Sequence, residues 1–184
     1  MTVTGEYCAL DKKPLLEPRV FYQISSGVYI ISSRKSDKFN GMIASSITQI
    51  SSDPPKMIIS LYKETLTHEF IQESRVFSIS ILSSVTPKKF IMLFGFRTGK
   101  TYDKFKEIQY KIGSSGAPIV LENTVGYLDC QVVDSLDCDL YTVFVGKVVD
   151  AELLSTTTPM TFMHYAEVLK GKVPSTAPIF ACGC

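Results

Sequence analysis

Short runs of β-branched and aromatic residues recur along the chain, and they restrict its fold more than any other feature. Such runs favour β-strands, particularly where apolar and polar residues alternate. They cover residues 27–33, 39–51, 57–62, 76–82, 125–133 and 141–151. No regular alternation of strand and helix accompanies them, so a parallel sheet of βαβ units is not expected. The pattern predicts a mainly β protein with antiparallel strands closed into a barrel.

A few segments change to a helical period. Leu66, Phe70 and Ile71 recur at helical spacing, which predicts a helix over residues 65–74, with Thr65 or Thr67 as its cap. A second helix is predicted from Thr86 and Pro87 to about residue 94, since proline is favoured in a first turn. A closing helix is predicted over residues 160–169. Residues 95–106 form an irregular basic loop, and residues 134–139 form an acidic turn between the last two strands.

Composition indicates one ordinary globular domain. The 184 residues are 45% hydrophobic and 20% charged, with a net charge of +1, which gives no sign of a nucleic-acid or membrane footprint. We expect an arm over residues 1–18, a domain over 19–178 and a tail over 179–184. The start of the chain lacks the apolar core of a signal peptide, and the five cysteines are odd in number and scattered. These features predict a cytoplasmic protein with reduced thiols.

Several familiar chemistries are not supported. The two glycines of the segment 95–101 have three residues between them, whereas a phosphate-binding P-loop needs four. No Gly-x-Gly-x-x-Gly is present. The two histidines, His68 and His164, are almost a hundred residues apart, and Cys182 and Cys184 lack partners at zinc-site spacing. No metal site is therefore predicted.

One segment places small residues where a core strand would prefer bulk. It consists of Asn40, Gly41, Met42, Ile43, Ala44, Ser45 and Ser46. Glycine in a strand often marks the close approach of a ligand or another backbone. The main-chain groups of such a segment can read the edge of a planar ring, and only one of the two serines can face a given ligand. A β-bulge explains the same pattern.

Two further segments suit a phosphate. Lys63, Thr65 and Thr67 lie where a strand gives way to a helix, whose N-terminus attracts anions. Ordinary helix capping is the alternative there. Arg97, Lys100 and Lys104 form a basic loop that either meets a phosphate or is a solvated surface.

Taken together, these residues resemble the flavin reductase family, which has the FMN-binding split-barrel fold. The resemblance is carried by residues 27–31, 40–46, 52–55 and 67–68, and later by residues 90–96, 116–118, 145–151 and 170–174. Within that family these motifs are most similar to those of archaeal ferric reductases and of the flavin domain of high-molecular-weight rubredoxins.

The resemblance implies a homodimer with FMN in a groove near the subunit interface. It implies that the backbone of residues 40–44 contacts the isoalloxazine ring. Ser45 or Ser46, Lys63, Thr65 and Thr67 would hold the ribityl chain and phosphate, with Arg97 added to the phosphate shell. The implied reaction is hydride transfer from NADH or NADPH to FMN, and then electron transfer to free flavin, ferric iron or a small redox protein.

One position departs from the family pattern. Family members carry a histidine in the turn before the last long strand, and here that position falls on Tyr141. A tyrosine can stack on a ring or hydrogen-bond to it, but it cannot supply an imidazole. Three hypotheses remain: an FMN-dependent reductase, an FMN electron carrier that uses NAD(P)H poorly, and a module of this fold that binds heme or an altered flavin.

Overall fold

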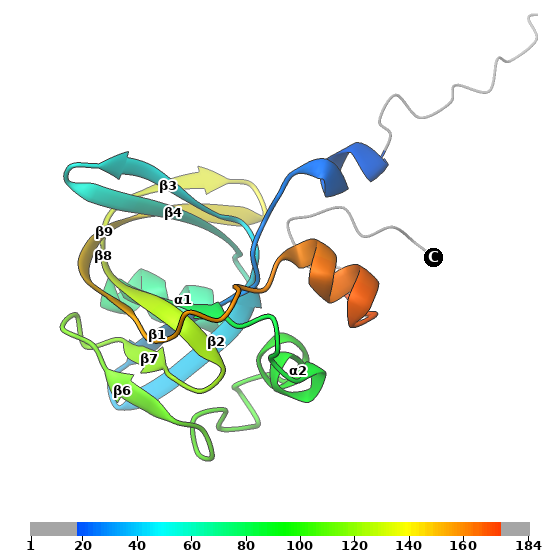
Figure 1. The fold of residues 1–184 in the computed structure, drawn as a ribbon. Helices are drawn as coiled ribbons and strands as arrows, with labels where there is room; N and C mark the ends of the chain where they lie inside the picture. The colour runs from blue at the N-terminus through cyan, green and yellow to red at the C-terminus, as the bar shows by residue number, and fades with distance from the viewer. Residues whose placement is uncertain (1–17, 174–184) are drawn as a thin grey trace, which may run out of the picture.

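In the computed structural model of the protein, residues 18–173 are described, and they are built around one curled antiparallel sheet (Figure 1). The sheet has seven strands in the order β2-β1-β5-β8-β9-β4-β3. Their bounds are Tyr29–Lys35 for β1, Lys38–Ala44 for β2, Ile47–Ser52 for β3, Pro55–Tyr62 for β4, Val76–Leu82 for β5, Thr124–Cys138 for β8 and Tyr141–Leu153 for β9. A separate hairpin pairs β6 (Tyr110–Ile112) with β7 (Pro118–Val120).

The barrel is split between β2 and β3. These strands follow each other in the chain but lie at opposite edges of the sheet, and only Ser45 and Ser46 join them. Ser46 already belongs to the far side, because its carbonyl accepts a hydrogen bond from the amide of Ser60 in β4. The expected mainly β split barrel is therefore confirmed, and the single extended segment predicted over residues 39–51 is in fact two strands.

The helices lie where the sequence period changes. Helix α1 covers Leu66–Ser74, and Thr65 caps it by accepting a hydrogen bond from the His68 amide. Helix α2 covers Lys88–Phe96, with Pro87 at the position before its first turn. A short 3-10 helix, η1, covers Pro18–Gln23. The predicted closing helix starts near Phe162, and its second half, η2 (His164–Val168), is π-helical.

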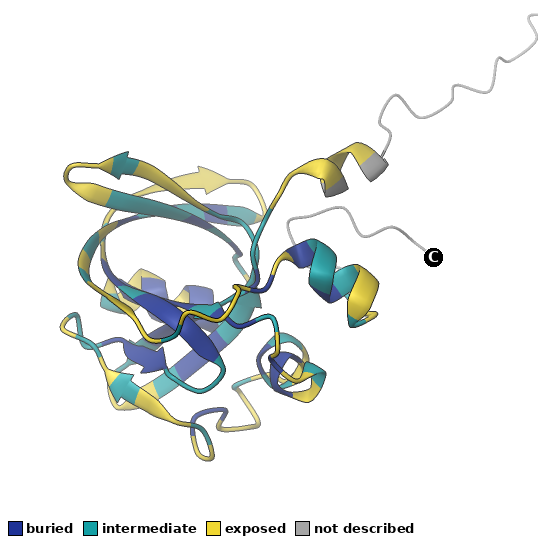
Figure 2. Cartoon of the chain, in the orientation of Figure 1, coloured by how far each residue is buried: buried dark blue, intermediate teal, exposed yellow. Residues whose placement is uncertain are grey.

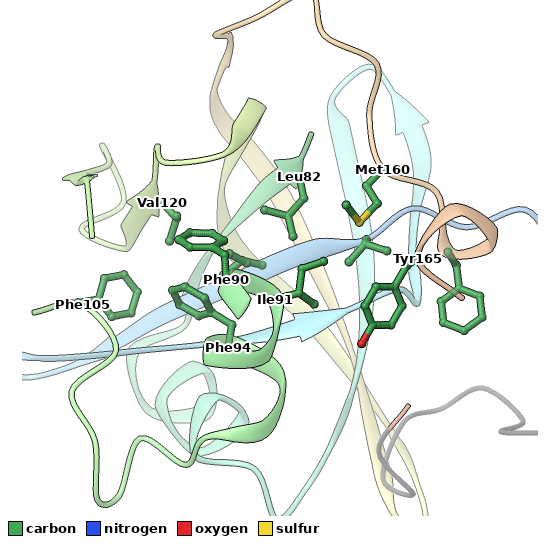
Figure 3. Packing of buried hydrophobic residues seen from close by; sticks show 11 residues of the cluster. Leu82, Phe90, Ile91, Phe94, Phe105, Val120, Met160 and Tyr165 are labelled. Carbon is green, nitrogen blue, oxygen red and sulfur yellow. The ribbon is translucent and has the colours of Figure 1, made fainter. Parts of the chain in front are cut away.

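Two apolar clusters form the core. The first lies inside the curled sheet and includes Ile31, Ile59, Phe77 and Phe144. The second joins α2 to the sheet and to the C-terminal helical segment. In this cluster Phe90, Ile91 and Phe94 project from α2 toward Phe105 on one side and Tyr165 on the other (Figure 3). The second cluster places α2 beside the free edge of β2.

One loop prediction is wrong. Residues 134–139 were expected to form a turn, but β8 continues to Cys138, and Asp134–Cys138 pair with Tyr141–Val145 of β9. The charged residues mislead because this end of the hairpin is solvent-exposed, so acidic side chains are tolerated there without ending the strand. Only Asp139 and Leu140 form the turn, and Asp139 has a φ of 50°.

The predicted arm over residues 1–18 and the predicted tail over 179–184, with Cys182 and Cys184, lie outside the described residues apart from Pro18. Within residues 18–173, none of the helices has the length and apolar character needed to cross a bilayer.

Candidate functional site

A pocket of about 360 Å³ lies beside the free edge of β2, a volume typical of small-molecule sites. Its walls come from β2, the end of β4, the N-terminus of α1, the C-terminal half of α2 with the loop after it, and the C-terminal helical segment. One end is polar and is lined by Asn40, Ser45, Thr65, Thr67, Arg97, Thr98 and Lys100. The other end is apolar and is lined by Val28, Ile91, Phe94, Phe162, Tyr165 and Val173.

The edge of β2 offers main-chain groups to this side. A two-residue turn joins β1 to β2, and Lys35 and Lys38 form the closing pair of the ladder. In such a hairpin the closing pair is hydrogen-bonded, so residues 38, 40, 42 and 44 direct their backbone groups at β1. The backbone N–H and C=O groups of residues 39, 41 and 43 then face outward. This edge therefore presents main-chain donors and acceptors to its open side, and the Gly41 carbonyl among them already accepts a 2.8 Å hydrogen bond from Nζ of Lys104.

Asn40 is the polar side chain most firmly built into the pocket wall. It is only 3% exposed, and its Nδ2 donates a 2.8 Å hydrogen bond to Oγ1 of Thr67, which is itself buried. Its Oδ1 is buried without a hydrogen-bond partner. A Cβ on Gly99 would approach this oxygen to 2.1 Å, so the loop after α2 fits closely over it only because residue 99 is glycine. The pocket thus contains an unused acceptor.

The N-terminus of α1 contributes unused donors. The amides of His68 and Glu69 bond to the side chain and carbonyl of Thr65. The amides of Leu66 and Thr67 belong to the same first turn, where a helix leaves N–H groups unsatisfied. Because the Thr65 hydroxyl donates to the carbonyl of Tyr62, it serves the helix cap rather than a ligand. Thr65 lines the pocket, but its hydroxyl hydrogen is already donated to the carbonyl of Tyr62.

The loop after α2 supplies cations. Arg97 lines the pocket, and its guanidinium lies 4.5 Å from the centre of the Tyr102 ring. Lys100 also lines the pocket. Lys104 differs from both, because it is buried instead of solvated, and burial lowers its pKa to about 8. Sequence reasoning missed this burial, since a lysine between Asp103 and Phe105 shows no periodic pattern.

Four predicted residues do not line the pocket: Gly41, Ser46, Lys63 and Tyr141. Ser46 does not line the pocket, whereas Ser45 does. Lys63 pairs with Asp137 at 2.7 Å in a shallow hollow on the outer side of α1. The α-carbon of Gly41 faces Ser32 and the Phe94 ring, so the close approach that its glycine permits is that of α2.

Tyr141 lies one residue beyond the pocket. It stands opposite Tyr62 in the β4–β9 ladder, and the centres of the two rings are 5.6 Å apart. Tyr62 lines the pocket and Tyr141 does not. Nearby, Nε2 of the buried His68 is 2.8 Å from Oγ1 of Thr142, and burial together with Lys63 lowers the pKa of this imidazole.

Comparisons with known proteins agree on one family. A model described as the flavin reductase like domain matches residues 21–170. The high molecular weight rubredoxin of Moorella thermoacetica is 39% identical over 168 residues, 91% of this chain and 73% of that protein. The ferric-chelate reductase (NAD(P)H) of Archaeoglobus fulgidus is 37% identical over 165 residues, 90% of this chain and 98% of that protein.

A solved structure shows the same fold. The NADH:FAD oxidoreductase of Streptomyces globisporus superimposes with a TM-score of 0.72 at 24% identity, covering 86% of this chain and 94% of that one. The split barrel with an open β2 edge defines a flavin-binding type of protein. The chain belongs to the flavin reductase family.

The unused groups of the pocket fit a phosphorylated flavin. The unpaired Oδ1 of Asn40 can accept from a ribityl hydroxyl, and the first-turn amides of α1 with Arg97 suit a phosphate. The outward N–H and C=O groups of Ile43, a residue of β2 that lines the pocket, suit the acceptors and donors of a pyrimidine edge. Sequence reasoning identified this polar end but missed the apolar end, because Phe162 and Tyr165 lie far from β2 in the chain and meet it only through packing on α2.

Proposed function

We propose that this protein is an FMN-dependent reductase that takes electrons from NADH or NADPH. The observation that carries the proposal is the pocket at the split of the barrel, where an unpaired buried acceptor, free strand-edge groups and a helix N-terminus meet. Bound FMN would accept a hydride from the nucleotide and pass electrons to ferric iron, free flavin or a small redox protein.

The chain's own residues position this chemistry. The outward backbone groups of Ile43, the outward-facing residue of β2 that lines the pocket, orient the ring, and Asn40 and Ser45 hold the ribityl chain. Thr67, the first turn of α1 and Arg97 bind the phosphate. The apolar end of the pocket excludes water from one side of the site.

Absorbance spectroscopy tests the proposal directly. Titration of the purified protein with FMN, FAD and riboflavin should give the tightest binding for FMN, and excess NADH or NADPH without oxygen should bleach the oxidised flavin spectrum within seconds. An Arg97→Met variant should weaken FMN more than riboflavin. A flavin that stays oxidised for minutes with either nucleotide would refute the reductase activity. Failure of all three flavins to bind would refute the whole proposal.

A separate observation supports a second candidate function. Neither of the chain's two histidines lines the pocket. By the resemblance given above, Tyr141, which contacts Tyr62, stands where family members carry a histidine. A flavoprotein without an imidazole near the ring would serve as an FMN electron carrier that docks a redox partner and uses NAD(P)H poorly. The bleaching experiment separates the two functions.

Restoring the imidazole isolates the role of Tyr141. Tyr141→His should speed flavin reduction by NADH or NADPH if the missing histidine limits the rate. Tyr141→Phe is the matched control, since it keeps the contact with Tyr62 but adds no acid or base. Equal rates for the histidine variant and the wild type would exclude Tyr141 as the limiting position.

We further propose a homodimer. The outer half of the β8–β9 hairpin is exposed together with β3, as the yellow strands at the top of the sheet show (Figure 2). Its exposed apolar side chains include Ile50, Val133, Leu136 and Leu140. A second copy would cover them. Light scattering should give twice the chain mass, and Leu136→Asp should halve it; an unchanged mass for this variant would exclude the surface.

We infer a cytoplasmic location. The support is the odd, scattered set of cysteines, of which Cys130 is buried and free and Cys138 is exposed and free. Free thiols persist where the surroundings are reducing. Fractionation of cells that produce the protein would test this location.

A further inference from the structure

Lys104 brings an ammonium group beneath the open edge of β2. It is only 4% exposed, and its Nζ donates to the carbonyl of Gly41 at 2.8 Å and to that of Phe94 at 3.2 Å. The Gly41 carbonyl belongs to the outward set of β2, and the Phe94 carbonyl lies in the last turn of α2. A lysine ammonium has three donors, so one N–H remains after these two bonds. Lys104 also lines the pocket.

The charge of Lys104 is not balanced by a carboxylate within residues 18–173. The lysines that form ion pairs there are Lys35, Lys63 and Lys111. The adjacent Asp103 carboxylate accepts from the amide of Phe105 instead. Two carbonyls accept hydrogen bonds from the ammonium, and the negative end of the α2 dipole lies near it, so its charge is compensated only in part. A buried cation is normally paired, and burial alone lowers the pKa of Lys104 to about 8.

Other charged groups around this ammonium come from each packed element. Glu64 stands before α1, Arg97 and Lys100 lie in the loop after α2, and Lys172 lies in the C-terminal segment; all four line the same pocket. Three of the four are cations, so the pocket as a whole favours a negatively charged ligand. Lys104 is the buried member of this group.

We propose that Lys104 is the residue that makes this pocket prefer reduced flavin to oxidised flavin, by placing a buried positive charge beside the ring. This inference depends on the proposed flavin occupant. A hydride adds two electrons and one proton to a neutral ring, so the reduced ring carries one negative charge until a second proton arrives. A cation at the strand edge that orients the ring stabilises this charge, and low local polarity strengthens the effect.

The proposal fixes the sign of a pH effect. In the free protein the ammonium is charged below a pKa of about 8. Bound reduced flavin raises this pKa further, whereas neutral oxidised flavin does not. At pH values between the pKa of Lys104 with oxidised flavin and its higher pKa with reduced flavin, reduction of the flavin adds an extra proton to Lys104. The two-electron midpoint potential should therefore fall by about 30 mV more per pH unit above pH 8 than it does without the lysine, because tenfold in equilibrium constant equals about 30 mV.

The experiment measures the midpoint potential of bound FMN against reference dyes from pH 7 to 10, without oxygen. Lys104→Met should lower the potential at pH 7 by about 30 mV or more and remove the extra slope, equivalent to at least a tenfold loss of preference for reduced flavin. Lys104→Arg should retain the wild-type potential. Lys106→Met is the matched control, since Lys106 is exposed in the same loop, and it should change nothing.

Other results overturn the inference. A Lys104→Met potential within about 10 mV of the wild type would show that the charge does not act on the ring. If Lys104→Met weakened the binding of oxidised and reduced FMN equally and left riboflavin binding unchanged, Lys104 would be assigned to the phosphate instead of the ring. If the methionine variant does not fold, the wild-type pH profile decides: an extra slope above pH 8 supports the inference and its absence refutes it. Wild-type protein that binds no flavin would refute the proposed function itself.

Discussion

Asn40→Ala separates the stability of the protein from its affinity for flavin. The variant loses the buried hydrogen bond from Nδ2 to Thr67, which contributes about 1 kcal/mol to stability. It also removes Oδ1, an unpaired buried acceptor whose burial costs about 1–3 kcal/mol. The substitution also leaves Oγ1 of the buried Thr67 without its donor, at a similar cost, so the gain from removing Oδ1 is offset and the free energy of unfolding of the ligand-free protein should fall by about 1 kcal/mol.

Flavin binding should respond more strongly to the same substitution. In the complex a ligand hydroxyl satisfies Oδ1, and its loss removes about 1–1.5 kcal/mol, close to tenfold in dissociation constant. Fluorescence titration measures the affinity, and urea unfolding of the ligand-free protein measures the stability. Ser80→Ala is the control, because it removes another unpaired buried oxygen that does not line the pocket. An Asn40→Ala variant that binds flavin within twofold of the wild type would refute this role of Oδ1.

Three further outcomes test the packing and electrostatics around the site. Lys63→Met should leave FMN affinity within about twofold of the wild type by the same titration, because Lys63 pairs outside the pocket; a tenfold loss would return it to the phosphate shell. The pKa of His68 is lowered in the folded state, so stability should fall as pH drops below about 6.5, and His68→Gln should flatten that part of the urea-midpoint profile. Gly146→Ala should destabilise the protein by about 1–3 kcal/mol in urea, because its Cβ would lie 2.4 Å from the ring of Phe77. Gly95→Ala, with 3.5 Å to its nearest neighbour in a helix, should be neutral or stabilising, and the reverse order of these two glycines would contradict the packing.

Sequence patterns predicted the elements that obey local rules. Strand β5 and helix α1 follow from alternation and from helical spacing with a Thr65 cap, and both form where expected. The break at Ser45 and Ser46 was not predicted, because it depends on which strands pair at the two edges of the sheet. Pairing partners far apart in sequence leave no local pattern, so the sequence placed the small residues of the pocket but not the split that opens it.

The site shows the same division. Asn40, Ser45, Thr67 and Arg97 were expected from small-residue and helix-start patterns, and they line the pocket. Lys63 carries the same local pattern, yet its ammonium lies outside the pocket. It binds the carboxylate of Asp137, which lies 74 residues later in the outer part of the long β8–β9 hairpin. The orientation of a long charged side chain is decided by distant partners, which explains why Lys63 does not line the pocket.

The order of the strands has a consequence for how the chain folds. Strands β1 and β2, β3 and β4, and β8 and β9 are neighbours in sequence and can form as hairpins within microseconds. The contacts of β5 with β1 and of β9 with β4 join residues about 45 to 90 positions apart, and such long loops slow folding. Both edges of the pocket are therefore local hairpins, but the split between them acquires its width only when the distant strands dock. We expect the ability to bind flavin to return late in refolding, after most of the strand signal is restored.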